Sequence, residues 1–302
     1  MNKILVVGSS NTDMVIRTKN FPQPGETLLG GVFMMNPGGK GANQAVAAAR
    51  LGGQTLFVCK TGNDIFGSQT RENLKKEGID TSYLLTDPEA PSGVALITVN
   101  AEGENTIVVA QGSNNHLTPD DLRQIPELEQ AEIIVVQLEI PMETVEFLVS
   151  EAKKKNLKMI LNPAPAQKLT DTLLDGLFLI TPNESEAALL TGVQVKDQAS
   201  ASEAASVLQK KGVHNVVITL GKKGAYLKAG SRPGLIIAAP AVKALDSTAA
   251  GDTFNGALAV ALSEDMEWER AVGFACRAAS LSVTRAGAQA SIPYRGEIDA
   301  QT

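Results

Sequence analysis

The stretch that decides the fold is Ile4-Leu5-Val6-Val7-Gly8-Ser9-Ser10-Asn11. Its apolar part is short, rich in β-branched residues and closed at once by turn residues, which is typical of a fully buried strand. Further runs of this kind follow at residues 56–60, 133–137, 159–162, 177–181 and 216–220. We therefore expect a series of buried strands along most of the chain.

Helical stretches lie between these runs. Residues 42–51 are rich in alanine and stop at Gly52-Gly53, Asp64 can cap a helix that ends at Gly78, and residues 142–155 follow Pro141 at a helix start. Strands that alternate with helices predict an α/β fold, with a doubly wound, mostly parallel sheet and helices on both faces.

Two segments interrupt this alternation. Residues 13–36 and 92–112 show little helical period, and residues 94–99 and 106–109 flank a turn in the manner of a hairpin. We expect them to form a small projecting sheet, a lid, which has to cover a ligand, another subunit or both because it cannot bury two faces alone. Without repeats or a long linker, residues 1–302 are predicted to be one domain with this lid inserted.

Composition narrows the partners. The 302 residues carry a net charge of −6 without a dense basic block, which argues against nucleic acid. The first apolar run is too short for a signal peptide or a membrane span, so no membrane partner is expected. Cys59 and Cys276 stand among apolar residues as buried thiols would, which fits a reducing, cytoplasmic location.

The strongest candidate for chemistry is Asp246-Ser247-Thr248-Ala249-Ala250-Gly251-Asp252-Thr253-Phe254. An apolar helix is predicted over residues 253–262, so its first N–H groups and its dipole can hold a phosphate. Ala249, Ala250 and Gly251 leave the approach free of side chains, and Asp252 can accept a proton from an attacking hydroxyl. The alternative is that Asp252 is only an N-cap.

A second glycine-rich run, Asn36-Pro37-Gly38-Gly39-Lys40-Gly41-Ala42-Asn43-Gln44, opens the alanine-rich helix. It is not a P-loop, because no glycine stands five residues before Gly39 and no Ser or Thr follows Lys40. The first strand also lacks the dinucleotide-binding glycines, which argues against a nicotinamide-dependent dehydrogenase. The alternative for the run is a tight turn before a helix.

Three further groups of polar residues follow predicted strands. Asn183 and Glu186 share a face at a helix start, or form an ordinary acidic first turn. Residues 219–224 carry two glycines, as a phosphate cradle or a plain hairpin would. Asn11, Asp13 and Glu139 lie at carboxyl ends of strands, where open α/β sheets bind ligands, and such side chains suit a polyol.

The order and spacing of these motifs resemble the pfkB-type carbohydrate kinase family, from Ile4 through Arg295. The two signatures that carry the resemblance are Gly38-Gly39-Lys40-Gly41-Ala42-Asn43 and Asp246 to Phe254. The resemblance implies a doubly wound domain with a β-sheet lid, transfer of a phosphoryl group from Mg·ATP to a sugar, activation by K⁺, and a homodimer formed through the lid.

The resemblance also implies roles for individual residues. Asp252 would be the base, and Ala249, Ala250 and Gly251 the anion hole. The sugar would be held by Asn11, Asp13, Gly39, Lys40, Gly41, Asn43, Glu139 and Asp252. The nucleotide would contact Asn183, Thr219, Leu220, Gly221, Lys222, Lys223, Gly224, Gly251 and Cys276, the last standing where a polar residue is usual. Asn183 and Glu186 would govern Mg²⁺ placement, and the monovalent cation would lie near Asp246, Thr248, Ser282, Arg285, Gly287 and Ser291.

For the acceptor, we expect the 5-hydroxyl of D-ribose, because Asn11, Asp13 and Glu139 together suit several hydroxyls. Deoxyribose, fructose or a nucleoside are the alternatives, although an aromatic content of 4% disfavours stacking on a base. A non-catalytic sugar-binding regulator is a further alternative, and an intact Asp252 motif argues against it.

Overall fold

The structure is a computed structural model that describes residues 3–300. Its main sheet has the order β13-β12-β11-β10-β9-β8-β1-β4-β5, and only the pairings of β12 with β11 and β13 are antiparallel. These strands are β1 (Lys3–Val7), β4 (Gln54–Gly62), β5 (Leu84–Asp87), β8 (Ile133–Val136), β9 (Lys158–Leu161), β10 (Leu179–Ile180), β11 (Asn215–Thr219), β12 (Ala225–Ala229) and β13 (Leu235–Ile237).

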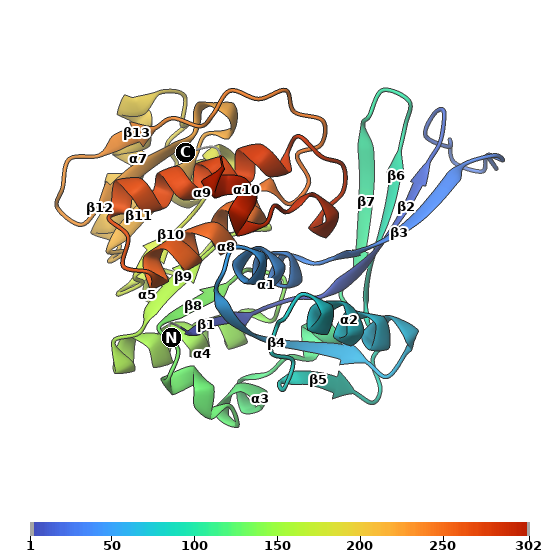
Figure 1. Cartoon of the computed structure of the whole chain (residues 1–302), viewed down its shortest axis with the longest axis horizontal. Helices are drawn as coiled ribbons and strands as arrows, with labels where there is room; N and C mark the ends of the chain where they lie inside the picture. Colours follow the sequence, from blue (N-terminus) through green and yellow to red (C-terminus); the bar gives the residue numbers. More distant parts are fainter. Residues whose placement is uncertain (1–2, 301–302) are drawn as a thin grey trace.

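Helices cover both faces of this sheet (Figure 1). In β1, Ile4 and Val6 pack into one core and Leu5 and Val7 into the other. The first core is shared with α1 (Lys40–Arg50), α2 (Ile65–Lys76), α8 (Ala250–Ser263), α9 (Trp268–Ser282) and α10 (Arg295–Asp299). The second is shared with α3 (Pro119–Arg123), α4 (Met142–Lys155), α5 (Asp171–Leu174), α6 (Glu184–Thr191) and α7 (Gln198–Lys210). The predicted doubly wound α/β class is confirmed.

A second, four-stranded sheet projects from the main body (Figure 1). Its order is β3-β2-β6-β7, with β2 (Asn11–Arg17), β3 (Val32–Gly38), β6 (Gly93–Val99) and β7 (Asn105–Ala110). We call this sheet the lid. Strand β2 begins at Asn11, two residues before the predicted start of the segment, so one lid strand carries both Asn11 and Asp13.

Most predicted elements agree with the observed ones. Asp64 caps α2 by accepting the Gly67 N–H, and Pro141 precedes α4. The strand predicted at 177–181 contains only Leu179 and Ile180 as β10, although the Thr181 N–H still donates to the Leu161 carbonyl. Within residues 3–300 the structure contains no helix of the length and apolar character that a bilayer crossing needs.

Helices α1 and α8 pack tightly against each other at Gly256. A Cβ added to Gly256 of α8 would lie 2.5 Å from the Ala47 Cβ and 2.7 Å from the Gln44 carbonyl oxygen of α1. Small residues on both helices therefore allow the backbones to approach closely. This contact matters for the site because α1 carries Asn43 and α8 carries Asp252.

The variant Gly256→Ala is therefore expected to lower the free energy of unfolding by about 1–3 kcal/mol, because the added methyl group must push the two helices apart. Chemical denaturation measures this loss. Gly296→Ala in α10 is the matched control, since its Cβ would meet no atom within 4 Å. Equal stability of the two variants would contradict the tight α1–α8 contact.

Candidate active site

The candidate site lies beside β1, where the order in which strands are added to the main sheet reverses. Strand β1 pairs with β4 on one side and with β8 on the other, so the chain leaves β1 toward one edge and later returns to fill the opposite one. Open α/β sheets bind ligands at such a switch point, beyond the carboxyl ends of the strands. Residues 8–11 follow β1 there, and residues 137–139 follow β8.

Asp252 sits in the first turn of α8 and is only 7% exposed. Its Oδ2 accepts a hydrogen bond from Asn43 Nδ2 and its Oδ1 one from Gln44 Nε2, both at 2.9 Å. Burial raises the pKa of this carboxyl, and Lys40 and the two amide donors oppose that rise. The contact with Asn43 brings the two predicted signatures together.

Glu139 joins the glycine-rich run to the ends of β1 and β8. Its Oε2 accepts from Ser9 Oγ at 2.6 Å and from the Lys40 N–H at 3.0 Å, and its Oε1 lies 3.6 Å from Lys40 Nζ. Burial would lower the pKa of Lys40, but Asp252, Glu139 and Glu186 together raise it. The ammonium group therefore keeps its positive charge, and Glu139 is the carboxylate that it contacts.

Asp13 reaches the same cluster from lid strand β2. Burial, Glu139 and Asp252 raise its pKa to about 6, against a smaller lowering effect of Lys40. Its carboxylate lies over Gly38, where an added Cβ would come within 2.3 Å of Oδ2. Gly39 adopts φ 87° and touches the backbone of Asn11 and Ser10, so only glycine fits this crossing.

Asn114 is a site residue that the sequence analysis missed. It is 1% exposed, and its Nδ2 donates to Asn11 Oδ1 at 2.8 Å and to the Ser10 carbonyl at 3.1 Å. Its Oδ1 accepts from the Ser10 N–H at 2.9 Å. Asn114 thus fixes the Asn11 side chain. No local pattern around residue 114 signals this, because the partners of its side chain lie over 100 residues away.

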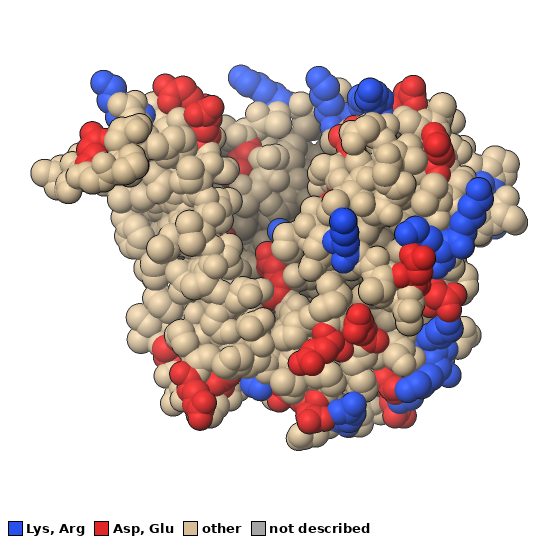
Figure 2. Space-filling model, turned by 180° about the vertical axis from the view of Figure 1, so that it is seen from behind, with Lys and Arg blue, Asp and Glu red and all other residues tan. Residues whose placement is uncertain are grey.

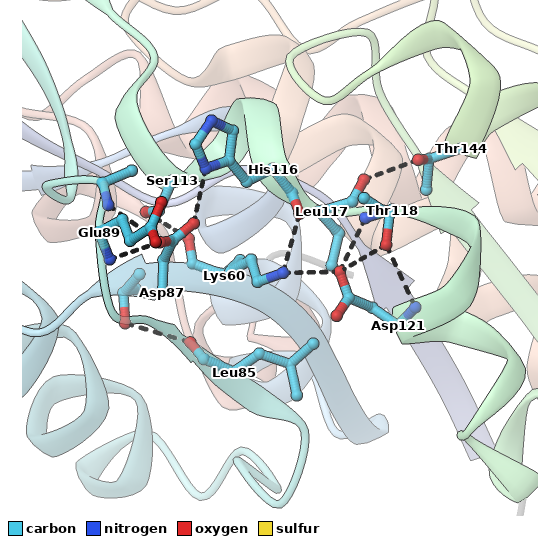
Figure 3. A network of polar contacts seen from close by, with 12 residues as sticks. Lys60, Leu85, Asp87, Glu89, Ser113, His116, Leu117, Thr118, Asp121 and Thr144 are labelled. Carbon is cyan, nitrogen blue, oxygen red and sulfur yellow. Dashed lines mark hydrogen bonds and ion pairs between the residues drawn. The ribbon is translucent and has the colours of Figure 1, made fainter.

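Polar contacts also fix the base of the lid hairpin β6–β7 to the main sheet (Figure 3). Ser113 Oγ donates to the Lys60 carbonyl at 2.9 Å, and Lys60 Nζ reaches Asp121 at 2.8 Å and the His116 carbonyl at 2.9 Å. His116 Nδ1 lies 2.7 Å from Asp87. These contacts hold η1 (Gly112–His116), and therefore Asn114, against β4 and β5.

A cavity of about 760 Å³ opens beside the start of α8. Much of the predicted nucleotide set lines it, namely Asn183, Thr219, Gly221, Lys222, Gly224, Gly251 and Cys276. Apolar residues such as Ala239, Val242 and Phe254 line the remainder. Leu220 is instead buried in the core, and Lys223 Nζ donates to the Lys196 carbonyl, so neither side chain lines the cavity.

The start of α8 is open toward this cavity. Ala249 adopts φ 58°, and the Ala250 N–H donates back to the Ser247 carbonyl at 3.2 Å. The N–H groups of Gly251 and Asp252 follow in the first turn, where no intrahelical carbonyl is available to accept them. A Cβ at Gly251 would meet nothing within 4 Å. An anion can therefore approach these two N–H groups freely.

Asn183 and Glu186 form a capping box at the start of α6. Asn183 Oδ1 accepts the Glu186 N–H and Glu186 Oε2 accepts the Asn183 N–H, each at 2.8 Å. Burial raises the pKa of Glu186, and the charge of Asp252 adds to this rise. The hydrogen bond from the Asn183 N–H and the charge of Lys40 lower the pKa. These contacts confirm the first-turn interpretation of the motif, and a role of the pair in placing Mg²⁺ stays a prediction.

The residues expected around a monovalent cation come from the loop before α8, from the end of α9 and from the segment that follows α9. Asp246 Oδ1 accepts from the Thr248 N–H and hydroxyl, and Oδ2 accepts from the Gly287 N–H at 2.9 Å. Arg285 pairs with Glu297 instead. The Ser282 and Ser291 hydroxyls donate to the Ala279 and Ala288 carbonyls, and so turn inward within their own segments.

A deep hollow between the lid and the main body contains acidic and basic side chains (Figure 2). Among residues 3–300 there is no group of three or more His, Cys, Asp or Glu side chains arranged to hold a metal ion. Asp252 is thus a buried carboxylate between two regions. One is a polar cage formed by Asn11, Asp13 and Glu139, and the other is the cavity beside the start of α8. This arrangement suits transfer of a phosphoryl group to a hydroxyl.

Comparison with known proteins agrees with this geometry. The model of the pfkB family carbohydrate kinases matches residues 1–295. The chain belongs to this family. A ribokinase of Haemophilus influenzae is 47% identical over 98% of this chain and 97% of its own length. A deoxyribokinase of Salmonella typhi is 39% identical over 96% and 95%.

The pfkB fold is also evident from solved structures. A structure of Arabidopsis thaliana ribokinase with ribose and ATP superposes with a TM-score of 0.92 and 32% identity, covering 99% of this chain and 97% of that one. The lid and the main sheet thus form the arrangement of a pfkB carbohydrate kinase. The two signature runs of the family meet in this chain through Asn43 and Asp252.

The raised pKa of Asp13 has a consequence for stability. A carboxyl whose pKa rises on folding stabilises the protein at low pH and loses that contribution as pH rises through the folded-state value, here about 6. We expect Asp13→Asn to increase the free energy of unfolding of the unliganded protein by about 1–3 kcal/mol at pH 8, and by little at pH 4.

Denaturation at several pH values measures this difference. Asp120→Asn, at an 84% exposed side chain, is the control and should change little at either pH. A gain for Asp13→Asn that did not depend on pH would contradict titration of the Asp13 carboxyl as its cause.

Proposed function

We propose that the protein phosphorylates D-ribose at its 5-hydroxyl with ATP, giving ribose 5-phosphate and ADP. The observation that carries this proposal is the position of Asp252. Its buried carboxylate is held by Asn43 and Gln44, and the residue before it lines the nucleotide cavity. The curated ribokinase at 47% identity supports ribose as the acceptor.

In the proposed reaction, Asp252 accepts the proton of the sugar hydroxyl as that oxygen bonds to the γ-phosphorus of ATP. The bond from the γ-phosphorus to the bridging oxygen breaks, and ADP leaves. The first-turn N–H groups of Gly251 and Asp252 stabilise the charge on the transferred group. Positioning and electrostatic stabilisation supply most of the acceleration in such transfers.

The polar cage accounts for the choice of a polyol. Asn11, Asp13 and Glu139 offer acceptors for hydroxyl groups, and Lys40 keeps a positive charge beside them. Asn43 Oδ1 is buried and has no hydrogen-bond partner among residues 3–300. A sugar hydroxyl that donated to this oxygen would satisfy it, and an unsatisfied buried acceptor is otherwise costly.

The lid supports the same assignment. It contributes Asn11 and Asp13 directly, so closure over a sugar would complete the cage and exclude water that could hydrolyse ATP. A non-catalytic regulator would need the cage, but it would have no use for a buried carboxylate beside an open helix start. We therefore favour the enzyme over the regulator.

Two ions complete the proposal. Mg²⁺ would be bound chiefly by the ATP phosphates near Asn183 and Glu186, and it would neutralise phosphate charge. A monovalent cation, K⁺, would lie between the loop of Asp246 and Thr248 and the loop of Gly287, held largely by carbonyl oxygens. Its charge would strengthen the anion site at the start of α8.

The acceptor is tested by measuring ATP-dependent phosphate transfer to ribose, deoxyribose, fructose and nucleosides. We expect ribose to give the highest kcat/KM, and deoxyribose is the acceptor to compare most closely because a deoxyribokinase is 39% identical. A higher kcat/KM for any other acceptor would overturn the proposed substrate. No transfer to any of them would overturn the kinase assignment.

Asp252→Asn is expected to lower kcat by roughly 10²–10⁴ with little change in ribose binding, because the amide cannot take the hydroxyl proton. Turnover assays and calorimetric ribose titration measure the two effects. Asp265→Asn, just beyond the other end of α8, is the matched control and should turn over normally. A near-native rate for Asp252→Asn would show that another group is the base.

A requirement for K⁺ is the next prediction. Activity in buffer rigorously freed of potassium, sodium and ammonium ions should fall severalfold and return on addition of K⁺. Asp246→Asn should weaken this response, because its carboxylate organises both loops. Equal activity with and without K⁺ would remove the cation from the proposal.

We also propose a homodimer formed through the lid, in the cytoplasm. The lid exposes large apolar side chains that one sheet cannot cover. Five of them are 53–69% exposed, namely Val32, Phe33, Leu96, Ile107 and Val108. Sedimentation velocity should give a dimer, and Val108→Glu should give a monomer. A monomeric parent protein would contradict this part of the proposal.

A further inference from the structure

A chain of three buried side chains runs from the end of β8 to the start of α8. Gln137 Nε2 donates to Gln44 Oε1 at 2.7 Å, and Gln44 Nε2 donates to Asp252 Oδ1 at 2.9 Å. Both glutamines are fully buried, at 0% exposure. Neither belongs to the predicted sugar or nucleotide sets. Gln44 uses both polar atoms of its side chain within the protein, whereas Gln137 Oε1 is buried without a hydrogen-bond partner among residues 3–300.

The direction of this chain is fixed by chemistry. An ionised carboxylate can only accept, so Gln44 must turn its NH₂ group toward Asp252 and its carbonyl toward Gln137. Gln137 holds that orientation by donating to the carbonyl. Gly8 leaves room for this arrangement, because a Cβ there would lie 2.0 Å from Gln137 Oε1.

Gln44 differs in this respect from its neighbour Asn43. Asn43 uses only its Nδ2 on Asp252 and keeps a buried acceptor, Oδ1, for a ligand. Both polar atoms of the Gln44 side chain are occupied within the protein, and the residue has no exposed surface. Gln44 can therefore act on the reaction only through Asp252.

We propose that Gln44, oriented by Gln137, is a positioning residue that holds the Asp252 carboxylate in place and ionised for proton abstraction. This inference rests on the proposed function of Asp252 as the base. By occupying Oδ1 it fixes the rotation of the carboxylate, so that the remaining lone pairs of Oδ2 face the hydroxyl. Rigid support of this kind is what keeps a catalytic group in productive geometry.

The charges around Asp252 set the direction of the pH effect. Burial raises its pKa, and the carboxylates of Glu139, Asp13 and Glu186 act in the same sense. Lys40 and the amides of Asn43 and Gln44 oppose them. Loss of the Gln44 donor therefore raises the pKa of Asp252 further, and the ionised base is lost at a higher pH.

The experiment compares Gln44→Met, Gln137→Met and the double variant with the parent protein. Met keeps the length of the side chain and removes both polar groups. The rate of phosphoryl transfer from ATP to ribose is measured in single turnovers by rapid quench between pH 5 and 9. For Gln44→Met we expect the transfer rate to fall about tenfold at neutral pH, with a ribose Kd within about threefold of the parent value. The acid limb of the pH–rate profile, in which the rate falls as Asp252 becomes protonated, should move to higher pH.

Gln137→Met should give a smaller change of the same kind. The double variant should match Gln44→Met, because Gln137 acts only through Gln44 and the two effects cannot add. Thr144→Val removes a different buried hydrogen bond, from Thr144 Oγ1 to the Leu117 carbonyl at 2.6 Å, and serves as the control. Its acid limb should coincide with that of the parent protein.

The measured rate is divided by the folded fraction of each variant at each pH, so a destabilised variant remains informative. An unchanged limb in Gln44→Met, or fully additive effects of the two substitutions, would overturn the inference. Asp252→Asn, run alongside, separates this failure from failure of the proposed function. If Asp252→Asn is inactive and the limb of Gln44→Met is unmoved, Asp252 is the base and Gln44 only a structural residue.

Discussion

The burial of one carboxylate, that of Asp252, is the constraint on which the rest of the site depends. A buried ionised group is costly unless donors and opposite charge surround it. Asn43 and Gln44 supply the donors at 2.9 Å, and Lys40 supplies the charge. All three stand within the first five residues of α1, so α1 and α8 must approach very closely. Gly256 and the alanines of α1 are the residues that allow this approach.

Close packing at the end of β1 places the start of α1 beside the site. The glycine-rich start of α1 has to cross the end of β1, and Gly41 and Gly39 lie against the backbone of residues 8–11 without room for a side chain. Glu139, at the end of the neighbouring β8, then ties the start of α1 down through Ser9 and Lys40. The switch point between β1 and β8 is thus where the two signature runs and the lid strand β2 converge.

The carboxylates of the cage illustrate how function opposes stability. Burial raises the pKa of Asp13 to about 6, repulsion by Glu139 and Asp252 adds to this rise, and the charge of Lys40 opposes it. A sugar whose hydroxyls donate to these groups would relieve the repulsion. Strand β2 of the lid carries one of these carboxylates, Asp13, so the lid contributes directly to the repulsion.

Local sequence determined the class of the fold, most strands and helices, and the chemistry of the two signature runs, because strand length, helix caps and the small residues before Asp252 are properties of neighbours along the chain. Strand ends indicated Asn11, Asp13 and Glu139 as residues for a polyol, and the resemblance to a family supplied the other predicted sugar and nucleotide residues. Only the tertiary structure decided that Gln44, Gln137 and Asn114 support the site. The hydrogen bonds from Gln137 to Gln44, from Asn114 to Asn11 and from Gln44 to Asp252 join residues that are 93 to 208 positions apart. No spacing along the chain encodes such contacts. They arise when separate strand ends and helix starts are packed together and each buried polar atom has to find a partner.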